Sequence, residues 1–342
     1  MKVVFYECEF WDGVYKKAQI AAKLKGHTVK FIDGSVNNSN IMEAKDADAV
    51  CTFVFSKIGK KELHAWKKCK LIATMSTGYN HINLKEAKKK KVTICNVPTY
   101  GSVTVAEYTF GLMLALSRKI ALAYDKARAG KFDLNGLRGM DLEGKTLGII
   151  GFGRIGQNVA TRATAFGMKV IAYDPNSKEV GREGTETIIT RNLEDVLKKS
   201  DIITLHSPLL ESTYHMINKE SINKMKKGVM IINTARGELI DSAALVQGLL
   251  SKKIAGAAID VIEEETTLKN ERKLFSENMD DAGSSMKTVV ANHVLIEMNC
   301  AIVTVHNAFN TREAVGRIVD TTVENVKMFS SKKVQNVVGV RK

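Results

Sequence analysis

Short apolar segments alternate with helix-like stretches along the chain, and this alternation limits the possible folds more than any other feature. Two parallel strands need a connection of about a dozen or more residues, usually a helix, so the pattern predicts parallel sheets covered by helices. The first series of expected strands comprises residues 2–6, 28–32, 49–55, 71–74 and 93–96. A second series comprises residues 146–150, 169–173, 202–205, 229–233, 256–259 and 302–305. The sequence therefore predicts an α/β fold with two doubly wound parallel-sheet domains.

The length of 342 residues also fits about two domains. We expect one domain at residues 102–306, built around the second series of strands. The last helix, expected at residues 311–329, lies beyond that series, and we expect it to return to the first domain. The first domain is then discontinuous and consists of residues 1–101 and 307–342.

The segment 103–129 is predicted to form one long helix. Its centre, residues 110–116, is apolar on every side, and a helix of this kind is buried all round. A second subunit can provide part of that burial, so this helix is the candidate contact of a homodimer. The apolar centre is far too short to span a membrane, and we expect no membrane association.

The chain carries 51 Lys and Arg against 37 Asp and Glu, a net charge of +14. Its densest basic run, residues 88–91, lacks interleaved aromatic residues, so we interpret it as a solvated helix end and expect no nucleic-acid partner. The five cysteines form no C-x-x-C pair, which favours reduced thiols in a cytoplasmic protein and argues against a metal site. Glu7 and Glu9 interrupt the first apolar run, so we expect no secretory signal peptide.

A glycine-rich loop, Gly151-Phe-Gly153-Arg-Ile-Gly156, lies between the expected strand 146–150 and a helix. The G-x-G-x-x-G pattern also occurs in ordinary turns, but here a strand precedes it and a helix follows it. In a dinucleotide site the first glycine makes the tight turn and the second lets the backbone approach the pyrophosphate. The third lets helix and strand pack closely, and the helix N-terminus faces the phosphate charge. The loop therefore predicts a dinucleotide-binding site.

Asp174 closes the next expected strand. An acidic side chain at this place accepts hydrogen bonds from the adenosine ribose, and its charge repels a 2′-phosphate. The sequence therefore predicts NAD as the cofactor and disfavours NADP.

Three segments that follow successive strands of the second series contain Arg236, Asp260 and His306. Ligands of open parallel sheets bind at the carboxyl ends of the strands, so we expect these three residues to face one crevice. Taken singly, each has an ordinary interpretation as a surface ion-pair partner or a packed core residue. Their joint placement in a dinucleotide-binding sheet favours a functional site.

These residue types fit the reduction of a 2-oxo acid. A guanidinium group binds a carboxylate through two parallel hydrogen bonds. A histidine titrates near neutral pH and can give a proton to the new hydroxyl group. A carboxylate beside it would hold its orientation, and Glu265 is our candidate in the run 263–265, for which a solvated face is the ordinary interpretation. The sequence thus predicts hydride transfer between NAD and the C2 carbon of a small 2-oxo or 2-hydroxy acid.

The chain resembles the D-isomer specific 2-hydroxyacid dehydrogenase family over nearly its whole length, and within it the D-lactate dehydrogenase branch. The segments that carry the resemblance are residues 76–83, 96–101, 105–107, 151–156 with Asp174, 205–208, 233–237, 256–265 and 306–309. The resemblance implies two Rossmann-like domains with a cleft between them, and a homodimer formed through the helix 103–129.

The resemblance also implies roles for individual residues. Arg236 binds the substrate carboxylate and polarises its carbonyl group, while His306 acts as acid and base with Glu265 as its partner. Further substrate contacts come from the backbone amides of Thr77 and Gly78, and from Tyr100, Phe309 and Phe53. The cofactor is contacted by Gly151, Gly153, Arg154, Ile155, Gly156, Asp174, His206, Ser207, Pro208, Thr213, Thr234, Ala235, Arg236 and Asp260.

Two positions depart from the family pattern. Val305 stands where a proline usually precedes the catalytic histidine, and Met75 stands where a basic residue is frequent. The missing cation argues against a phosphorylated substrate, so we expect pyruvate and D-lactate. Glyoxylate or hydroxypyruvate reduction and phosphoglycerate oxidation are the alternatives. A regulatory NAD-binding protein without activity is a third, against which the intact Arg236, Glu265 and His306 argue.

Overall fold

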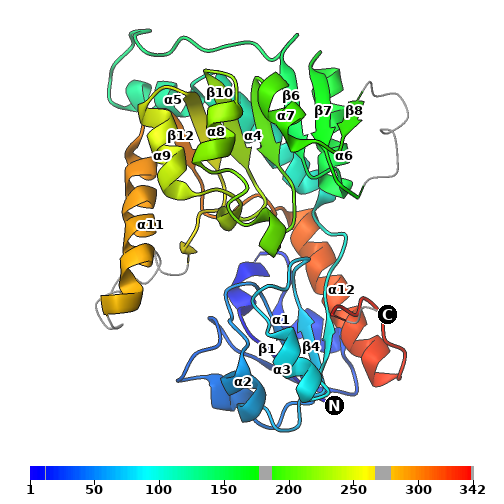
Figure 1. Cartoon of the computed structure of the whole chain (residues 1–342). Helices are drawn as coiled ribbons and strands as arrows, with labels where there is room; N and C mark the ends of the chain where they lie inside the picture. The colour runs from blue at the N-terminus through cyan, green and yellow to red at the C-terminus, as the bar shows by residue number, and fades with distance from the viewer. Residues whose placement is uncertain (12, 177–186, 266–278, 340–342) are drawn as a thin grey trace. The chain divides into compact units, whose positions relative to one another are not determined.

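The computed structural model of the chain describes residues 1–11, 13–176, 187–265 and 279–339. Internal contacts divide the chain into two units: unit 1 is Met1–Tyr100 with Asn310–Lys342, and unit 2 is Gly101–Phe309. Each unit contains one sheet of parallel strands and its own helices (Figure 1). The predicted fold class, with two doubly wound α/β domains, is confirmed. The sequence-based limits of the second domain, 102 and 306, lie inside unit 2.

Unit 1 has a five-stranded sheet in the order β2-β1-β3-β4-β5, and its strand pairs are parallel. Its elements are β1 (Lys2–Phe5), η1 (Cys8–Trp11), α1 (Lys17–Lys23), β2 (Thr28–Phe31), η2 (Ile41–Ala44), β3 (Ala49–Thr52), α2 (Lys60–Ala65), β4 (Leu71–Thr74), α3 (Leu84–Lys89), β5 (Thr93–Cys95) and α12 (Arg312–Ser330). The strand order reverses between β1 and β3, and such a switch point is where open α/β sheets bind ligands.

The helix α12 belongs to unit 1 although it lies near the end of the chain. It begins at the cap Thr311, whose hydroxyl accepts a hydrogen bond from the N–H of Ala314 at 3.2 Å. Its amphipathic pattern buries Val315, Ile318, Val319, Thr322, Val323 and Val326. The side chain of Asn325 donates to the carbonyl of Asn96 at 2.9 Å, which ties the helix to the segment after β5.

Unit 2 has a seven-stranded sheet in the order β12-β11-β10-β9-β6-β7-β8. Its elements are α4 (Ser102–Ser117), α5 (Ile120–Arg128), β6 (Thr146–Ile150), α6 (Arg154–Ala165), β7 (Lys169–Tyr173), β8 (Thr187–Thr190), α7 (Leu193–Lys199), β9 (Ile202–Leu205), η3 (Glu211–Thr213), α8 (Lys219–Lys224), β10 (Val229–Asn233), η4 (Gly237–Leu239), α9 (Ser242–Leu250), β11 (Ile254–Ile259), α11 (Met279–Glu297) and β12 (Ala301–Val303). The strand order reverses between β6 and β9, which is the switch point of this sheet.

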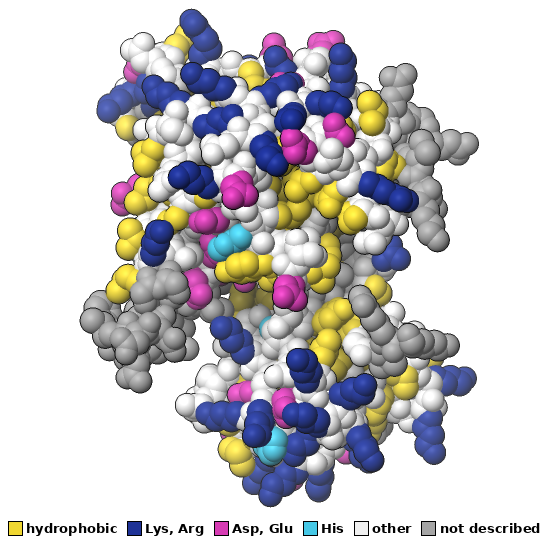
Figure 2. Space-filling model, viewed as in Figure 1, with side chains coloured by type: hydrophobic (Ala, Val, Ile, Leu, Met, Phe, Trp, Pro, Cys, Tyr) yellow, Lys and Arg dark blue, Asp and Glu magenta, His cyan; other side chains and the backbone are white. Residues whose placement is uncertain are grey.

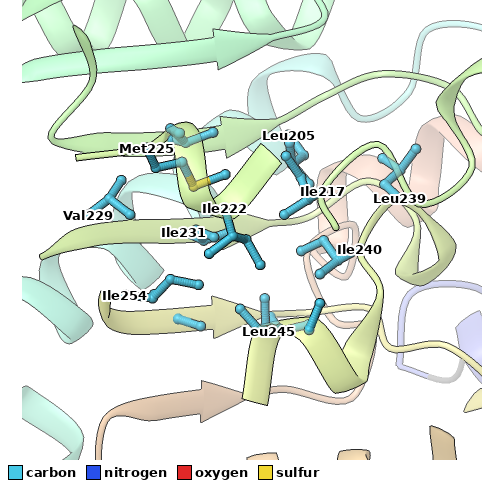
Figure 3. Close-up of a cluster of buried hydrophobic side chains, with 14 of the residues drawn as sticks. Leu205, Ile217, Ile222, Met225, Val229, Ile231, Leu239, Ile240, Leu245 and Ile254 are labelled. Carbon is cyan, nitrogen blue, oxygen red and sulfur yellow. The ribbon is translucent and has the colours of Figure 1, made fainter. Parts of the chain in front are cut away.

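Helices cover both faces of the unit 2 sheet, so its central strands are apolar on both sides. On one face, Ile222 of α8 and Leu245 of α9 pack against strand residues such as Ile231 (Figure 3). On the other face, α4 and α6 pack through Met113 and Val159. The continuous apolar runs of β9 and β10 follow from this two-sided burial.

The prediction of a single helix over 103–129 is wrong, because the segment forms α4 and α5 with a break at Lys119. Lys119 has a left-handed φ of 57°. The N–H of Met140 donates to the carbonyl of Ser117 at 3.0 Å, and a Cβ on Gly139 would lie 2.3 Å from the same oxygen. The segment that contains Gly139 and Met140 thus occupies the carbonyl of Ser117, which in a continuing helix would accept a hydrogen bond from the next turn.

Elsewhere the structure adds elements and shortens others. The bounds of β4, β6, β7, β9 and β10 are those predicted, whereas β8 and α11 were missed. The predicted strand 49–55 ends at Thr52, because the N–H groups of Phe53 and Phe55 donate to the carboxylate of Glu7 instead of to a neighbouring strand.

Basic side chains are spread over both units on the face that Figure 2 shows, with acidic side chains among them. None of the helices in the described part of the chain is long and apolar enough to cross a membrane.

Candidate functional site

The glycine-rich loop joins β6 to α6 at the switch point of the unit 2 sheet. Gly151 has a φ of 96°, and a Cβ there would lie 2.6 Å from the backbone of His206 and Ser207. A Cβ on Gly156 would lie 2.2 Å from the carbonyl oxygen of Gly151. A Cβ on Gly153, the N-cap of α6, would meet nothing within 4 Å. The first and third glycines therefore allow close packing, and the second leaves room before the helix N-terminus, as a pyrophosphate requires.

Asp174 follows β7 directly and lies beside this loop. Its Oδ2 accepts a hydrogen bond from the N–H of Phe152 at 3.0 Å, and its Oδ1 accepts one from the N–H of Asn176 at 2.9 Å. These bonds fix a carboxylate at the end of the strand next to the nucleotide loop, where a ribose hydroxyl would be bound.

His206, Ser207 and Pro208 follow β9, next to the glycine loop. The Nε2 of His206 lies 3.0 Å from the hydroxyl of Thr204, and its buried Nδ1 has no partner among the residues that the structure describes. Burial lowers the pKa of His206 to about 3, so its ring is neutral. A neutral buried imidazole fits packing beside a cofactor and not proton transfer.

The other predicted cofactor residues shape the same edge of the sheet. Arg154 and Ile155 open α6, and the hydroxyl of Thr213 donates to the carbonyl of Pro208 at 2.7 Å, which closes the turn after β9. The hydroxyl of Thr234, directly after β10, lies 3.0 Å from that of Thr109.

Arg236 follows β10 in a turn that the buried side chain of Asn233 holds. This side chain accepts a hydrogen bond from the N–H of Ala235 at 3.0 Å and donates to the carbonyl of Arg236 at 2.8 Å. A Cβ on Gly237 would lie 2.1 Å from the carbonyl carbon of Ile262. The turn that carries Arg236 is therefore in direct backbone contact with the loop after β11.

His306 and Glu265 are brought together across neighbouring strands. The Nδ1 of His306 lies 3.0 Å from the Oε2 of Glu265, and each side chain is 23% exposed. The ring of Phe309 stands edge-on to the imidazole at 6.4 Å. Since β10, β11 and β12 are adjacent and parallel, Arg236 and this pair leave the same edge of the sheet.

Asp260, which the family resemblance places beside the cofactor, directs its carboxylate at the loop that carries His306. Its Oδ1 accepts from the hydroxyl of Thr304 at 2.6 Å and the N–H of Asn307 at 2.8 Å, and its Oδ2 accepts from the N–H of Ala308 at 2.8 Å. Asp260 is 1% exposed, and its carbonyl accepts from the N–H of His306. It therefore fixes a loop in which His306 has a left-handed φ of 58°.

A second glutamate–histidine pair escaped the sequence analysis. Glu263 is buried, so a solvated face is the wrong interpretation for this residue. Its Oε1 contacts the Nε2 of His215, its Oε2 accepts from the N–H and hydroxyl of Ser242, and its carbonyl accepts from Asn292. The pair holds the loop after β11, which carries Glu265. No sequence signal pointed to it, because its partners come from three separate segments.

In unit 1 the loop after β4 carries the predicted substrate residues Thr77 and Gly78. The hydroxyl of Ser76 donates to the carbonyl of Gly78 at 2.6 Å, and Asn96 donates to the carbonyl of Thr77 at 2.8 Å. Within the described ranges, the N–H groups of Thr77 and Gly78 donate to no protein group. Two neighbouring N–H groups of this kind can bind one carboxylate.

Phe53, another predicted substrate residue, follows β3 and is 2% exposed. Its ring stacks on that of Phe10, with centroids 4.4 Å apart and planes at 17°. The ring of Phe55 stands edge-on to it at 5.6 Å. The contacts of Phe10 and Phe55 with Phe53 were not predicted from the sequence. The predicted Tyr100 accepts at its carbonyl from the Nε of Arg317, a side chain of α12, at 2.8 Å.

Comparisons with known proteins agree with this geometry. A family model described as "D-isomer specific 2-hydroxyacid dehydrogenase, NAD binding domain" matches residues 110–308. The chain is 41% identical to an aromatic 2-oxoacid reductase of Clostridium sporogenes over 90% of each chain. It is 38% identical to 2-hydroxyacid dehydrogenase homolog 2 of Schizosaccharomyces pombe over 96% of each. Among solved structures, D-lactate dehydrogenase from Aquifex aeolicus, complexed with NAD and lactic acid, is similar with a TM-score of 0.84 and 32% identity, over 99% of this chain and 100% of that one.

Proposed function

Since the chain belongs to the D-isomer specific 2-hydroxyacid dehydrogenase family, we propose that its substrates are pyruvate and D-lactate. The family establishes the coarser activity: the protein is a D-2-hydroxyacid dehydrogenase, and its cofactor is NAD, as the sequence predicted. The preference for pyruvate is supported by the similarity to the Aquifex D-lactate dehydrogenase. It is further supported by Met75, a fully buried apolar residue where a phosphorylated substrate would need a cation.

The observation that carries the proposal is the His306–Glu265 pair on the loops after β12 and β11. Glu265 occupies the Nδ1 of the imidazole, so the Nε2 is the atom that exchanges a proton with substrate. In reduction the Nε2 gives its proton to the C2 oxygen, and in oxidation it takes the hydroxyl proton back. Bound NAD supplies the hydride acceptor or donor for C2.

The remaining residues bind the substrate. The guanidinium of Arg236, on the turn beside the Glu265 loop, binds the carboxylate and polarises the carbonyl group at C2. The N–H groups of Thr77 and Gly78 also bind a carboxylate. Arg236 and the N–H groups of Thr77 and Gly78 thus bind the carboxylate end of the substrate. A small neutral side chain, such as the methyl group of pyruvate, then contacts only apolar residues.

A second candidate, the reduction of aromatic 2-oxo acids, is favoured by one observation. The rings of Phe10 and Phe55 pack on the buried ring of Phe53 at the end of β3 and are themselves only half-buried. Partly exposed aromatic rings favour stacking with flat ligands. The 41% identity to an aromatic 2-oxoacid reductase supports the same alternative.

A panel of 2-oxo acids decides between these functions. NADH oxidation would be followed with pyruvate, glyoxylate, hydroxypyruvate and phenylpyruvate, and kcat/KM is expected to be highest for pyruvate. The highest value with phenylpyruvate would replace the first candidate by the second. In the reverse direction, D-lactate and not L-lactate should reduce NAD.

The cofactor preference depends on Asp174. Asp174→Ala is expected to raise the ratio of kcat/KM with NADPH to that with NADH by roughly tenfold, about 1.4 kcal/mol, because a ribose acceptor and a charge that repels the 2′-phosphate are both lost. Asp133→Ala removes the same charge from an exposed loop and should leave the ratio unchanged. An unchanged ratio in Asp174→Ala would show that this carboxylate does not contact the ribose.

We also propose a homodimer formed through the segment 103–129. The support lies in α5, which buries no residue, and in the exposed side chains of Ile120 and Tyr124 on it and of Phe132 and Leu134 after it. Exposed apolar patches of this kind usually mark protein–protein contacts. Light scattering should therefore give twice the chain mass of 37.7 kDa, and a monomer mass at micromolar concentration would contradict the proposal.

A further inference from the structure

Glu7 is a buried carboxyl group that the proposed reaction does not use. It is 2% exposed. Its Oε2 accepts hydrogen bonds from the N–H of Phe53 at 2.7 Å and the hydroxyl of Ser56 at 2.6 Å, and its Oε1 accepts one from the N–H of Phe55 at 3.1 Å. Its own backbone has a left-handed φ of 58°, which is uncommon outside glycine. A single side chain thus fixes the backbone of the whole segment after β3.

The segment that Glu7 holds lies at the ligand-binding edge of the unit 1 sheet. β1 and β3 are parallel neighbours, with Phe5 opposite Cys51, so Glu7 and Phe53 leave the sheet at the carboxyl ends of adjacent strands. The strand order reverses between these two strands. Open α/β sheets bind their ligands at such a point.

Glu7 fixes the backbone positions of both rings in the stack of Phe10 on Phe53. The backbone of Phe53 is bound to the Glu7 carboxylate, and η1, which carries Phe10, begins directly after Glu7. Rings 4.4 Å apart with planes at 17° need both backbones at fixed positions. A buried carboxyl group loses its hydration on folding, which costs free energy that an apolar residue would not lose. The presence of Glu7 at this buried position therefore indicates that its hydrogen bonds to the segment after β3 have a structural or functional role.

We propose that Glu7 is a positioning residue for the substrate side chain, because it holds the buried ring of Phe53 as the support on which the half-buried ring of Phe10 forms a fixed aromatic wall for the side chain of a 2-oxo acid. This inference rests on the proposed function and on the expectation from the family resemblance that Phe53 lies at the substrate pocket. Glu7 raises kcat/KM for 2-oxo acids with a large apolar side chain and has no effect on glyoxylate, which has none.

Glu7→Gln tests the role because it keeps the shape and removes one acceptor. Glutamine has a single acceptor oxygen, so its NH2 group must face the N–H of either Phe53 or Phe55, and two donors then oppose each other. The segment after β3 must shift, and the ring of Phe53 loses its place against Phe10.

The experiment compares kcat/KM for phenylpyruvate and glyoxylate in the wild type, Glu7→Gln and Glu9→Gln. In Glu7→Gln, kcat/KM for phenylpyruvate is expected to fall about tenfold, mainly through KM, while that for glyoxylate changes less than about twofold. Glu9→Gln is the matched control: Glu9 loses the same charge two residues away, but its carboxylate binds the N–H of Gly34. Its selectivity should be that of the wild type.

Each outcome has a definite meaning. Equal losses with both substrates, or no loss with either, overturn the inference and leave the proposed function intact. Wild-type turnover of glyoxylate without phenylpyruvate also overturns the inference alone. A wild type that turns over no 2-oxo acid overturns the proposed function and the inference together. If Glu7→Gln does not fold, Ser56→Ala removes one of the three donors and is judged by the same comparison.

The pH dependence of the selectivity gives a second measurement. Burial raises the pKa of Glu7 to about 7, and the charge of Glu9 on η1 adds to the rise. Cys51 on β3 contributes no charge, because burial raises the pKa of its thiol. Protonation of Glu7 replaces one acceptor oxygen of its carboxylate by an O–H group. The hydrogen bonds that fix the backbone of Phe53 therefore weaken as the pH falls.

The ratio of kcat/KM for phenylpyruvate to that for glyoxylate should therefore fall about threefold between about pH 8 and pH 6 in the wild type. It should stay constant in Glu7→Gln. The ratio cancels the titration of groups that act on both substrates equally. A wild-type ratio that does not change with pH would count against the role of Glu7.

Discussion

His306→Gln is expected to lower kcat by about 10²–10⁴-fold in both directions, the usual contribution of a general acid or base. Glutamine fills the same place but has no proton to exchange at neutral pH. The loop itself should survive, because the carboxylate of Asp260 holds it through Thr304, Asn307 and Ala308, and not through the imidazole. The measurement is kcat for pyruvate reduction and for D-lactate oxidation.

Two further variants test whether the loss comes from proton transfer. Glu265→Gln keeps the imidazole and removes only the partner at its Nδ1, so its loss of kcat should be smaller than that of His306→Gln. His64→Gln changes an exposed histidine of α2 and should leave kcat unchanged. Turnover by His306→Gln within tenfold of the wild type would remove His306 from the proton-transfer step.

Arg236→Gln is expected to lower kcat/KM for every 2-oxo acid by on the order of 10²–10⁴-fold. A hydrogen bond to a charged group contributes about 1.5–3 kcal/mol, and the guanidinium supplies two to the carboxylate. The turn should largely keep its shape, because the side chain of Asn233 binds the backbone of Ala235 and Arg236. The guanidinium adds one bond to the turn, from its Nη1 to the carbonyl of Ala235 at 2.6 Å, which the variant loses.

The affinity for NADH separates a substrate residue from a cofactor residue. Quenching of protein fluorescence by NADH should give the variant a Kd within about twofold of the wild-type value, a difference of less than 0.5 kcal/mol. Arg236→Lys keeps the charge and loses the two-pronged geometry, so its activity should fall between those of the wild type and Arg236→Gln. A large loss of NADH affinity in Arg236→Gln would assign the side chain to the cofactor.

Features fixed by a local pattern could be predicted from the sequence. The glycine loop needs three glycines, a strand and a helix within one short segment, and the structure gives Gly151, Gly153 and Gly156 the packing that this pattern requires. The central strands β4, β9 and β10 were predicted for a similar reason, because burial on both faces makes each of them a continuous apolar run. The edge strand β8, which is only partly buried, was missed. Glu265 was the candidate partner of His306 that the family resemblance singled out from the run 263–265, and the structure brings the two side chains within 3.0 Å.

Features fixed by distant partners could not be predicted. Glu7 and Phe53 are 46 positions apart, and His215 and Glu263 are 48 positions apart. Each of these acids looks like a surface residue until the fold brings its donors together. The break between α4 and α5 is of the same kind, because it depends on the approach of Gly139 and Met140 to the carbonyl of Ser117.

The return of α12 to unit 1 determines the order in which the units can be completed during synthesis. Unit 2 is continuous, Gly101–Phe309, so all of it is made before α12 exists. The strands of unit 1 are made first, yet the carbonyl of Asn96 meets Asn325, and Cys95 pairs with Val337, only when the last residues emerge. Domains usually fold as units in the order of their synthesis. Here the first sheet to leave the ribosome is the last to be covered. A nascent chain ending at residue 309 would expose the apolar surface that packs against α12, and such surface promotes aggregation until the helix is made.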